Sequence, residues 1–420
     1  MTVKVLDAIC GSGKTSYAIQ HINENPDKLF IYVTPFLSEV KRIKNETIPE
    51  FYEPEIKYGK GKKSNHIKIL VEEAANIVMT HELFARLDQE TLMNIKLEGY
   101  TLIMDEVANV LNAVGDITKD DIRSLRDSKI LRIEPTGEIT WLDSNYNGVF
   151  NHLKVLAMKK NLFLHNEVII FWTMPVINFS SFEGVYILTY LFDGQIQKYY
   201  YDMHEIKYRK YSVVKAEEKY KLTQYSKSLE PRDYIGSLLG IYEDYQNGKS
   251  ISKLNTNYLV KSNKPDKALS KKWFDKADTS QIDQLRKNLL TFFTTQASTK
   301  VDDLFWTTFK TLAPKIKNKK CKINKKDDRS KDNFIPFNTR ATNAYADKTA
   351  MAFVLNRFMN PNEKQFFSNR GIEVDEDLLA TSDLIQFLFR GCIRNNKPMN
   401  CYIPSSRMRT LLKKWINFEI

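Results

Sequence analysis

The segment DAICGSGKTS, residues 7–16, constrains the fold more than any other part of the chain. It follows the apolar run VKVLDA (3–8) and precedes the helical pattern KTSYAIQHI, so it joins a strand to a helix. Gly11 and Gly13 allow consecutive backbone N–H groups to point at one anion, and Lys14 adds a positive charge. A turn of this kind predicts a phosphate-binding loop in an α/β domain.

The loop matches the A-x-x-G-x-G-K-T variant of the P-loop, with Ala8 at a position where the usual form has glycine. We expect Lys14 to reach the β and γ phosphates of a nucleotide and the Thr15 hydroxyl to hold Mg²⁺. The residues expected to bind the nucleotide are Gly11, Ser12, Gly13, Lys14, Thr15 and Ser16. The alternative is a chance glycine loop between a strand and a helix.

A second motif, the acidic segment LIMDEV, ends another apolar run about 90 residues after the glycine loop. Asp105 is the expected Mg²⁺ ligand, acting through the water shell of the ion. Glu106 is the expected base that orients and deprotonates the attacking water. An acidic pair that merely solvates the end of a strand is the alternative. Together with the glycine loop, the pair predicts hydrolysis of a nucleoside triphosphate.

Short apolar runs separated by helical patterns fill the first 175 residues, and this pattern is typical of a parallel α/β sheet. The runs are VKVLDA (3–8), LFIYVTP (29–35), NIVMTH (76–81), YTLIMDEV (100–107) and VIIFWTMP (168–175). The segment LRIEPTGEITWL (131–142) predicts a β-hairpin inserted between the last two of them. GVYILTYLF, after residue 180, is a further candidate strand.

The rest of the chain divides into a basic region and a second globular region. Residues 205–330 are rich in lysine and aromatic residues and mostly helical in pattern, and the chain looks globular again from 336. It ends in NCYIPSSRMRTLLKKWI, a short strand followed by an amphipathic helix. We therefore predict domains at 1–180 and 181–420, the second interrupted by an insertion at about 205–330.

Composition limits the classes of protein that remain. Lys and Arg number 63 and Asp and Glu number 51, a net charge of +12 that favours polyanionic partners without specifying one. The 4 cysteines are scattered, as expected for reduced thiols rather than a zinc site. No apolar run is long enough to predict a membrane span, so a cytoplasmic protein is expected.

The order of these motifs resembles that of superfamily 2 helicases, most of all the compact DNA helicases of tailed phages. AICGSGKTS, VTPFLSEV, VMTHELF, IMDEVANV and FWTMP are similar to motifs I, Ia, Ib, II and III. SDLIQFLFRGCIRN looks like motif VI of the second RecA-like domain, and NTRATNAYADKTAM (338–351) lies where motif V is expected. The resemblance implies two RecA-like domains with parallel sheets and a mostly helical inserted region.

The resemblance also implies roles for residues near the C-terminus. Gln386 would contact the region of the γ-phosphate. Arg390 would be the arginine finger that stabilises charge on the transferred phosphoryl group, with Arg394 as a second candidate. A solvated or phosphate-binding arginine on a helix is the alternative for both.

Nucleic-acid contacts are implied at two places. Motifs Ia and Ib correspond to Thr34, Pro35, Thr80 and His81, although Thr80 could simply cap the following helix. The lysine run at 315–326 is a candidate for phosphate contacts, and its members include Lys315, Lys317, Lys319 and Lys320. A solvated loop is the alternative for this run. Candidates for stacking on bases are Trp273, Phe292, Phe293, Trp306 and Phe309, but such aromatics are more often core residues.

The leading hypothesis is an ATP-dependent DNA helicase or translocase with ATP and Mg²⁺ in an interdomain cleft. By the same resemblance it would act on single-stranded or forked DNA in phage replication or recombination, in the host cytoplasm, with other proteins of those pathways. RNA stays open as the nucleic acid. One alternative is a phage terminase-type packaging ATPase, with Asp332, Asp347 and Glu373 among candidate nuclease carboxylates. Another is a nucleotide-gated clamp that binds nucleic acid without unwinding it.

Overall fold

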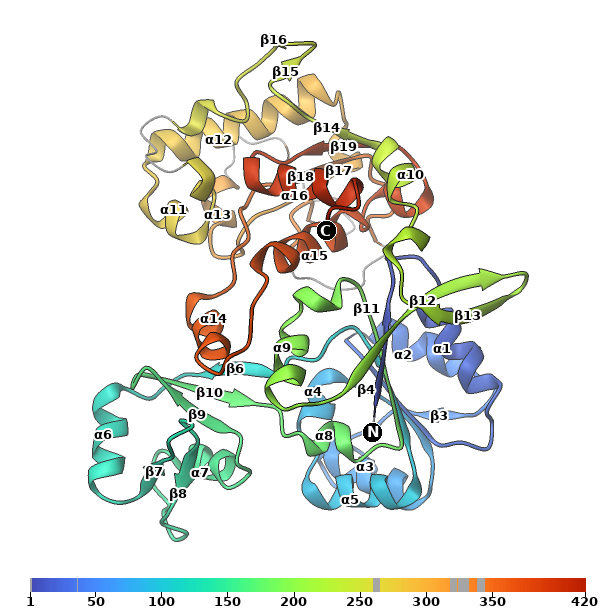
Figure 1. Cartoon of the computed structure of the whole chain (residues 1–420), viewed down its shortest axis with the longest axis vertical. Helices are drawn as coiled ribbons and strands as arrows, with labels where there is room; N and C mark the ends of the chain where they lie inside the picture. Colours follow the sequence, from blue (N-terminus) through green and yellow to red (C-terminus); the bar gives the residue numbers. More distant parts are fainter. Residues whose placement is uncertain (1, 36, 260–264, 318–322, 324–331, 338–343) are drawn as a thin grey trace. The chain divides into compact units, whose positions relative to one another are not determined.

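The computed structural model describes residues 2–35, 37–259, 265–317, 323, 332–337 and 344–420 (Figure 1). The chain forms two compact units. Unit 1 consists of residues 1–8, 12–225 and 360–374, and unit 2 of residues 9–11, 226–359 and 375–420. The division therefore falls after residue 225 and not at 180, where the sequence led us to expect it.

Unit 1 is built on an eight-stranded sheet in the order β13-β12-β1-β11-β5-β2-β4-β3. Every neighbouring pair from β12 to β3 is parallel, and only β13 runs antiparallel to its neighbour. The strands are β1 (Val3–Asp7), β2 (Phe30–Thr34), β3 (Phe51–Tyr52), β4 (Asn76–Thr80), β5 (Thr101–Asp105), β11 (Gly184–Thr189), β12 (Tyr208–Ala216) and β13 (Lys219–Gln224). Four of the five predicted runs are strands of this sheet.

The strands of this sheet carry apolar side chains on both faces. Helices pack on the sheet, and the strands are therefore almost fully buried. These helices are α1 (Lys14–Asn23), α2 (Leu37–Glu46), α3 (Lys63–Glu72), α4 (His81–Ala85), α5 (Gln89–Glu98), α8 (Ile177–Ser180) and α9 (Ile196–Met203). The core on one face includes Val5, Ile31 and Leu102, and the core on the other face includes Leu6, Tyr32 and Ile103. The alternation of neighbouring residues between the two faces follows from the strand period of two.

The fifth predicted run, VIIFWTMP, is not in the main sheet. It forms β10 (Ile169–Thr173), which pairs antiparallel with β6 (Leu111–Val114) and β9 (Leu162–His165). The place beside β5 is taken instead by β11, the run after residue 180. A short apolar run has the same pattern in either sheet, so its length and composition could not distinguish the two positions.

Residues 111–173 make up a small module inserted between β5 and β11 (Figure 1). It has its own core, which includes Ile122, Leu153 and Ile170. Its other elements are α6 (Lys119–Asp127), β7 (Leu131–Ile133), β8 (Ile139–Trp141) and α7 (Asn151–Ala157). β7 and β8 pair antiparallel, which confirms the predicted hairpin, and Gly137 in its turn has a φ of 85°.

Unit 2 contains a four-stranded parallel sheet in the order β14-β19-β18-β17. These strands are β14 (Leu239–Ile241), β17 (Leu304–Thr307), β18 (Ala350–Phe353) and β19 (Met399–Tyr402). The helices of the chain from residue 226 onward are α10 (Arg232–Ser237), α11 (Lys271–Lys276), α12 (Thr279–Thr291), α13 (Ala313–Ile316), α14 (Pro361–Ser368), α15 (Glu376–Leu388) and α16 (Ser406–Ile416). Of these, α14 belongs to unit 1. The predicted final strand and helix are confirmed as β19 and α16.

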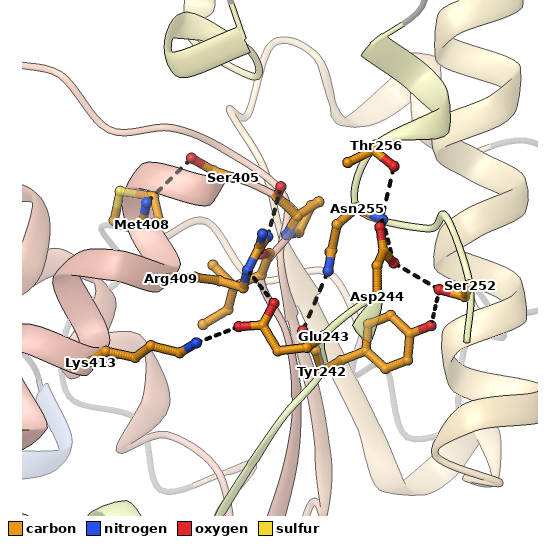
Figure 2. A network of polar contacts seen from close by, with 12 residues as sticks. Tyr242, Glu243, Asp244, Ser252, Asn255, Thr256, Ser405, Met408, Arg409 and Lys413 are labelled. Atoms are coloured by element: carbon orange, nitrogen blue, oxygen red, sulfur yellow. Dashed lines mark hydrogen bonds and ion pairs between the residues drawn. The ribbon is translucent and has the colours of Figure 1, made fainter. Parts of the chain in front are cut away.

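A polar network fixes the chain that leaves β14 (Figure 2). The buried carboxylate of Asp244 accepts hydrogen bonds from Ser252 Oγ at 2.7 Å, from the Asn255 backbone N–H at 3.1 Å and from Thr256 Oγ1 at 3.3 Å. Glu243 accepts one from Lys413 Nζ on α16 at 2.6 Å. The network holds residues 242–256, which include the hairpin β15 (Tyr245–Gln246) and β16 (Lys249–Ser250), against the sheet.

The predicted fold class is confirmed, because both units are α/β with parallel sheets. The region 205–330, predicted to be mostly helical, contains α10, α11, α12 and α13 among its described residues, but it also contains strands. Its ends supply β12 and β13 to the first sheet and β14 and β17 to the second. The aromatics Phe292, Phe293 and Trp306 are buried in the core of unit 2, so they are packing residues.

Candidate phosphate and nucleic-acid sites of unit 1

The glycine loop connects β1 to α1, as predicted. Gly11 and Gly13 have φ values of 82° and 90°, in the left-handed region that favours glycine. Gly13 is the N-cap of α1, whose first residue is Lys14. The Lys14 ammonium donates a hydrogen bond to the Ala8 carbonyl oxygen and so lies back over the loop. A helix N-terminus with glycines and a lysine attracts an anion through its free N–H groups and positive dipole.

The acidic pair lies at the carboxyl end of β5. Glu106 has a φ of 66°, strained for a residue with a side chain, and its backbone N–H donates to the Leu188 carbonyl oxygen at 2.9 Å. The pKa of the Asp105 carboxyl is raised to about 7, first by burial and then by the neighbouring charges of Glu106 and Glu39. Lys14 and Arg42 act in the opposite direction. A buried carboxylate beside another carboxylate is a group that a divalent cation would stabilise.

Buried polar atoms without a hydrogen-bond partner among the described residues gather at the same edge. They include Ser12 Oγ in the loop and side-chain oxygens at the carboxyl ends of three strands, which are Thr34 Oγ1 at the end of β2, Glu106 Oε2 after β5 and Thr189 Oγ1 at the end of β11. Unsatisfied buried polar groups cost free energy and call for an explanation. Their convergence around a phosphate-type loop fits a bound nucleotide and cation.

Asp7 and Thr189 belong to this site although the sequence analysis did not single them out. The Asp7 carboxylate accepts hydrogen bonds from the backbone N–H groups of Leu191 at 2.7 Å and Phe192 at 3.1 Å. The Ala8 N–H donates to the Thr189 carbonyl oxygen at 3.1 Å. These bonds tie the loop after β11 to the glycine loop. They join residues over 180 positions apart, and only an acid directly before the glycine loop could have suggested them.

The four residues expected to contact nucleic acid differ in their burial and in their hydrogen bonds. The Thr34 side chain is fully buried, and Thr80 Oγ1 accepts a hydrogen bond from the Leu83 N–H at 3.4 Å, so it caps α4. His81 is half-buried, and its Nε2 lies 2.8 Å from the Asp105 carbonyl oxygen. Pro35 is half-buried in the bend after β2. His81 thus connects the candidate nucleic-acid surface directly to the acidic pair.

A pocket of about 580 Å³ adjoins His81. It lies between α4 and the inserted module, and its lining includes Arg86, Lys159, Asn161 and Trp172. With its amide turned to satisfy both neighbours, Asn161 accepts a hydrogen bond from Trp172 Nε1 at 2.7 Å. We call this pocket, lined by residues of 81–87, 109–112, 156–161 and 172–175, the α4 groove. The positive charges of Arg86 and Lys159 suit the phosphates of a nucleic-acid strand, and the indole of Trp172 suits its bases.

The C-terminal candidates all lie in unit 2. Gln386, on α15, is half-buried, and its Nε2 donates to Ser382 Oγ at 3.4 Å. Arg390 is buried, and it donates to the carbonyl oxygens of Pro336 at 3.1 Å and Phe337 at 3.0 Å. Arg394 is exposed. Arg390 is thus engaged within its own unit, whereas Arg394 presents its charge to solvent.

Part of the lysine run is described. Lys315 is exposed, whereas Lys317 forms an ion pair with Asp332 and lies over the Phe334 ring at 4.6 Å from its centroid. Lys319 and Lys320 lie outside the described residues, as do residues 338–343 of the expected motif V.

Fold and site together define an α/β protein with a glycine loop at a helix N-terminus and an acidic pair at the same edge of the sheet of unit 1. Its sequence is 38% identical over 428 residues to the SPbeta prophage-derived uncharacterized protein YonV of Bacillus subtilis (strain 168), covering 99% of this chain and 98% of that protein. The model of the YonV C-terminal Rossmann-like domain matches residues 243–416, and that of the YonV middle domain matches residues 111–172. The chain belongs to the YonV family.

Two solved structures are similar in fold. An XPD helicase covers 99% of this chain and 94% of its own at 10% identity and a TM-score of 0.40. Xpd4 of S. tokodaii covers 100% of this chain and 94% of its own at 11% identity and a TM-score of 0.45.

The YonV middle domain coincides with the inserted module, so the module is a unit of the family. Among the described helices, none has the length and apolar character needed to cross a membrane.

Proposed function

We propose that this protein is an ATP-dependent motor on nucleic acid, a DNA helicase or translocase of the superfamily 2 type. The observation that carries the proposal is the group of unpartnered buried polar atoms around the glycine loop and Asp105. Such a group is costly in an empty site and is satisfied by a triphosphate with its cation.

ATP and Mg²⁺ are the ligands that these residues fit. The N–H groups of the loop and Lys14 would hold the β and γ phosphates, and Thr15 and Asp105 would hold the cation. The cation would neutralise charge on the transferred phosphoryl group. Glu106 would orient the attacking water. The left-handed backbone of Glu106 turns the chain away from the direction of β5.

Nucleic acid is the partner that the surface supports best. The α4 groove carries Arg86 and Lys159, and His81 connects it to the Asp105 carbonyl. Occupation of the groove could thereby shift the acidic pair. With a net charge of +12 the chain also attracts polyanions as a whole. DNA is preferred because the YonV relative is named as prophage-derived.

Two other functions remain as alternatives. A packaging ATPase would need a nuclease, but the Asp375 carboxylate caps α15 and the Asp377 carboxylate forms an ion pair with Arg407. Asp332 pairs with Lys317. A nucleotide-gated clamp would share the phosphate site and the α4 groove, and would differ in having slow turnover that nucleic acid leaves unchanged.

The testing experiment measures ATP turnover of the wild type and of Lys14→Ala. Each protein is assayed without nucleic acid and with single-stranded DNA, duplex DNA and RNA. We expect turnover that one of these polymers stimulates and that Lys14→Ala abolishes. Turnover that survives Lys14→Ala would reject the phosphate site, and turnover indifferent to all polymers would favour the clamp.

A further inference from the structure

The hairpin of β12 and β13 extends the main sheet beside the glycine loop. β12 pairs with β1, the strand that leads into the loop, on the side away from β11 and β5. β13 lies outside β12 and runs along α1 (Figure 1). The acidic pair and this hairpin are therefore on opposite sides of β1.

Tyr220, on β13, lies directly against the glycine loop. Its ring fills the space next to Gly13, because a Cβ atom at that glycine would come within 2.0 Å of Tyr220 Cε1. Gly13 is thus required twice, by its backbone angle and by this ring. Tyr220 is half-buried, so part of its ring surface remains open.

Helix α1 fixes the position of the ring through the backbone of the hairpin. The Tyr220 N–H donates to Gln20 Oε1 at 2.8 Å, and Gln20 Nε2 donates to the Tyr220 carbonyl oxygen at 3.1 Å. Next to it, Lys219 Nζ forms an ion pair with Glu24 at 2.8 Å. A side-chain amide that bonds to both the N–H and the carbonyl oxygen of one residue holds that residue in place.

The direction of a bound nucleotide follows from the order of the strands. The γ-phosphate must face the acidic pair on β5, because hydrolysis takes place there. The base is at the other end of the molecule and extends from β1 toward β12 and β13. Tyr220 is the aromatic side chain that the structure places against the loop on that side.

We propose that Tyr220 stacks on the base of the bound nucleoside triphosphate and is a binding residue of the site. This inference rests on the proposed function and adds a subsite for the base. Every base offers a π face, so stacking alone accepts all four nucleotides and favours the larger purines. The subsite comes from a hairpin more than 200 residues after the loop that it completes.

The test compares a ligand that has a base with one that has none. Binding of Mg-ATP and of magnesium tripolyphosphate is measured by calorimetry for the wild type, Tyr220→Ala and Tyr220→Trp. We expect Tyr220→Ala to weaken ATP binding roughly 5- to 100-fold and to leave tripolyphosphate binding unchanged. Tyr220→Trp should restore ATP binding and place an indole within energy-transfer range of a fluorescent ATP analogue.

Leu222→Ala is the matched control, since Leu222 is on the same strand and packs on the same core without an aromatic ring. The inference is overturned if Tyr220→Ala weakens both ligands equally or neither, or if Leu222→Ala has the same effect on ATP. A failure of the proposed function has a different result, in which the wild type binds ATP no better than Lys14→Ala does.

Discussion

Glu106 stores backbone strain at the point where the proposed chemistry requires it. Its φ of 66° puts a side chain in a region that costs about 1 kcal/mol or more, and its carboxylate has a buried oxygen without a hydrogen-bond partner among the described residues. Such strain persists only where the surrounding structure imposes it, here through the bond to Leu188. The neighbouring Asp105 is the last residue of β5 and burial raises its pKa, so the proposed cation would stabilise its ionised form.

Replacing Glu106 by Gln separates binding from hydrolysis. The amide has the same shape but cannot accept a proton, so we expect Glu106→Gln to bind ATP normally and to hydrolyse it roughly 10²- to 10⁴-fold more slowly. Calorimetry and single-turnover assays measure the two properties. Glu39→Gln is the control, because Glu39 also raises the pKa of Asp105 but lies on α2. Normal turnover in Glu106→Gln would place the base elsewhere.

His204 gives unit 1 a pH dependence that can be isolated. The pKa of its imidazole is lowered to about 4, first by burial and then by the charge of Arg370. An unfolded histidine titrates near pH 6.5. The unfolded state therefore binds more protons between these values, and the free energy of unfolding falls as the pH drops below about 6.5. It is restored in full only above that value.

Acid lowers the free energy of unfolding, and we expect His204→Phe to remove about 1 kcal/mol of this decrease, after allowance for the partial exposure of the ring. Urea unfolding near neutral pH and at about pH 5 measures this difference. Phe keeps the ring contact with Tyr200, whose centroid is 4.6 Å away, so packing is retained. Equal pH dependence of the two proteins would contradict the assignment.

The elements of unit 1 illustrate how far a sequence pattern reaches. The glycine loop, the acidic pair and four strands were predictable because each is a local pattern of glycine angles, charge or burial. The position of β11 beside β5, where β10 was expected, was not predictable, since both strands are apolar runs of similar length. Tyr220 and Thr189 reach the loop through long-range strand pairing, and that pairing leaves no local signal.

The inserted module can be removed without a gap in the chain. Leu111 and Thr173 are paired across β6 and β10, and the Met174 N–H donates to the Val110 carbonyl oxygen at 3.0 Å. A short Asn-Gly turn can therefore replace residues 112–172. We expect the shortened protein to keep basal ATP turnover within a few-fold and to lose stimulation by nucleic acid, because the α4 groove loses one wall.

Turnover and filter binding with labelled single-stranded DNA measure these two effects. A milder variant, Trp172→Ala, removes the indole from the groove and some packing beside β10, and Trp141→Ala, which also packs on the core of the module, is its control. Retained stimulation in the shortened protein would mean that nucleic acid binds to another surface. The helix α14 contacts the module through Phe366, whose ring centroid lies 4.9 Å from that of Phe171, so Phe366→Gln should accompany the deletion.

At the scale of the whole molecule, the chain passes between the units five times, at 8/9, 11/12, 225/226, 359/360 and 374/375. The segment 360–374 leaves unit 2 after β18, packs in unit 1 against the inserted module, and returns directly into α15. The helix that precedes the proposed arginines is therefore joined directly to a segment that belongs to unit 1. A change at the module has a short covalent route to α15.

The two arginines after α15 should respond differently to removal. Arg390 is buried and holds the carbonyl groups of Pro336 and Phe337, so Arg390→Ala should destabilise unit 2 by about 1–3 kcal/mol. Arg394 is exposed, and a finger acts by stabilising charge on phosphate rather than by packing. We expect Arg394→Ala to lower kcat roughly 10³-fold with an unchanged Tm.

Thermal unfolding and steady-state turnover, measured on the same samples, separate the two roles. Lys397→Ala is the control, because Lys397 is an exposed cation three residues further on. A loss of kcat in Arg390→Ala at temperatures where the variant is fully folded would return the finger to Arg390. That result would require the guanidinium to leave its two carbonyl groups during turnover, so hydrolysis would then be coupled to a rearrangement at residues 336–337.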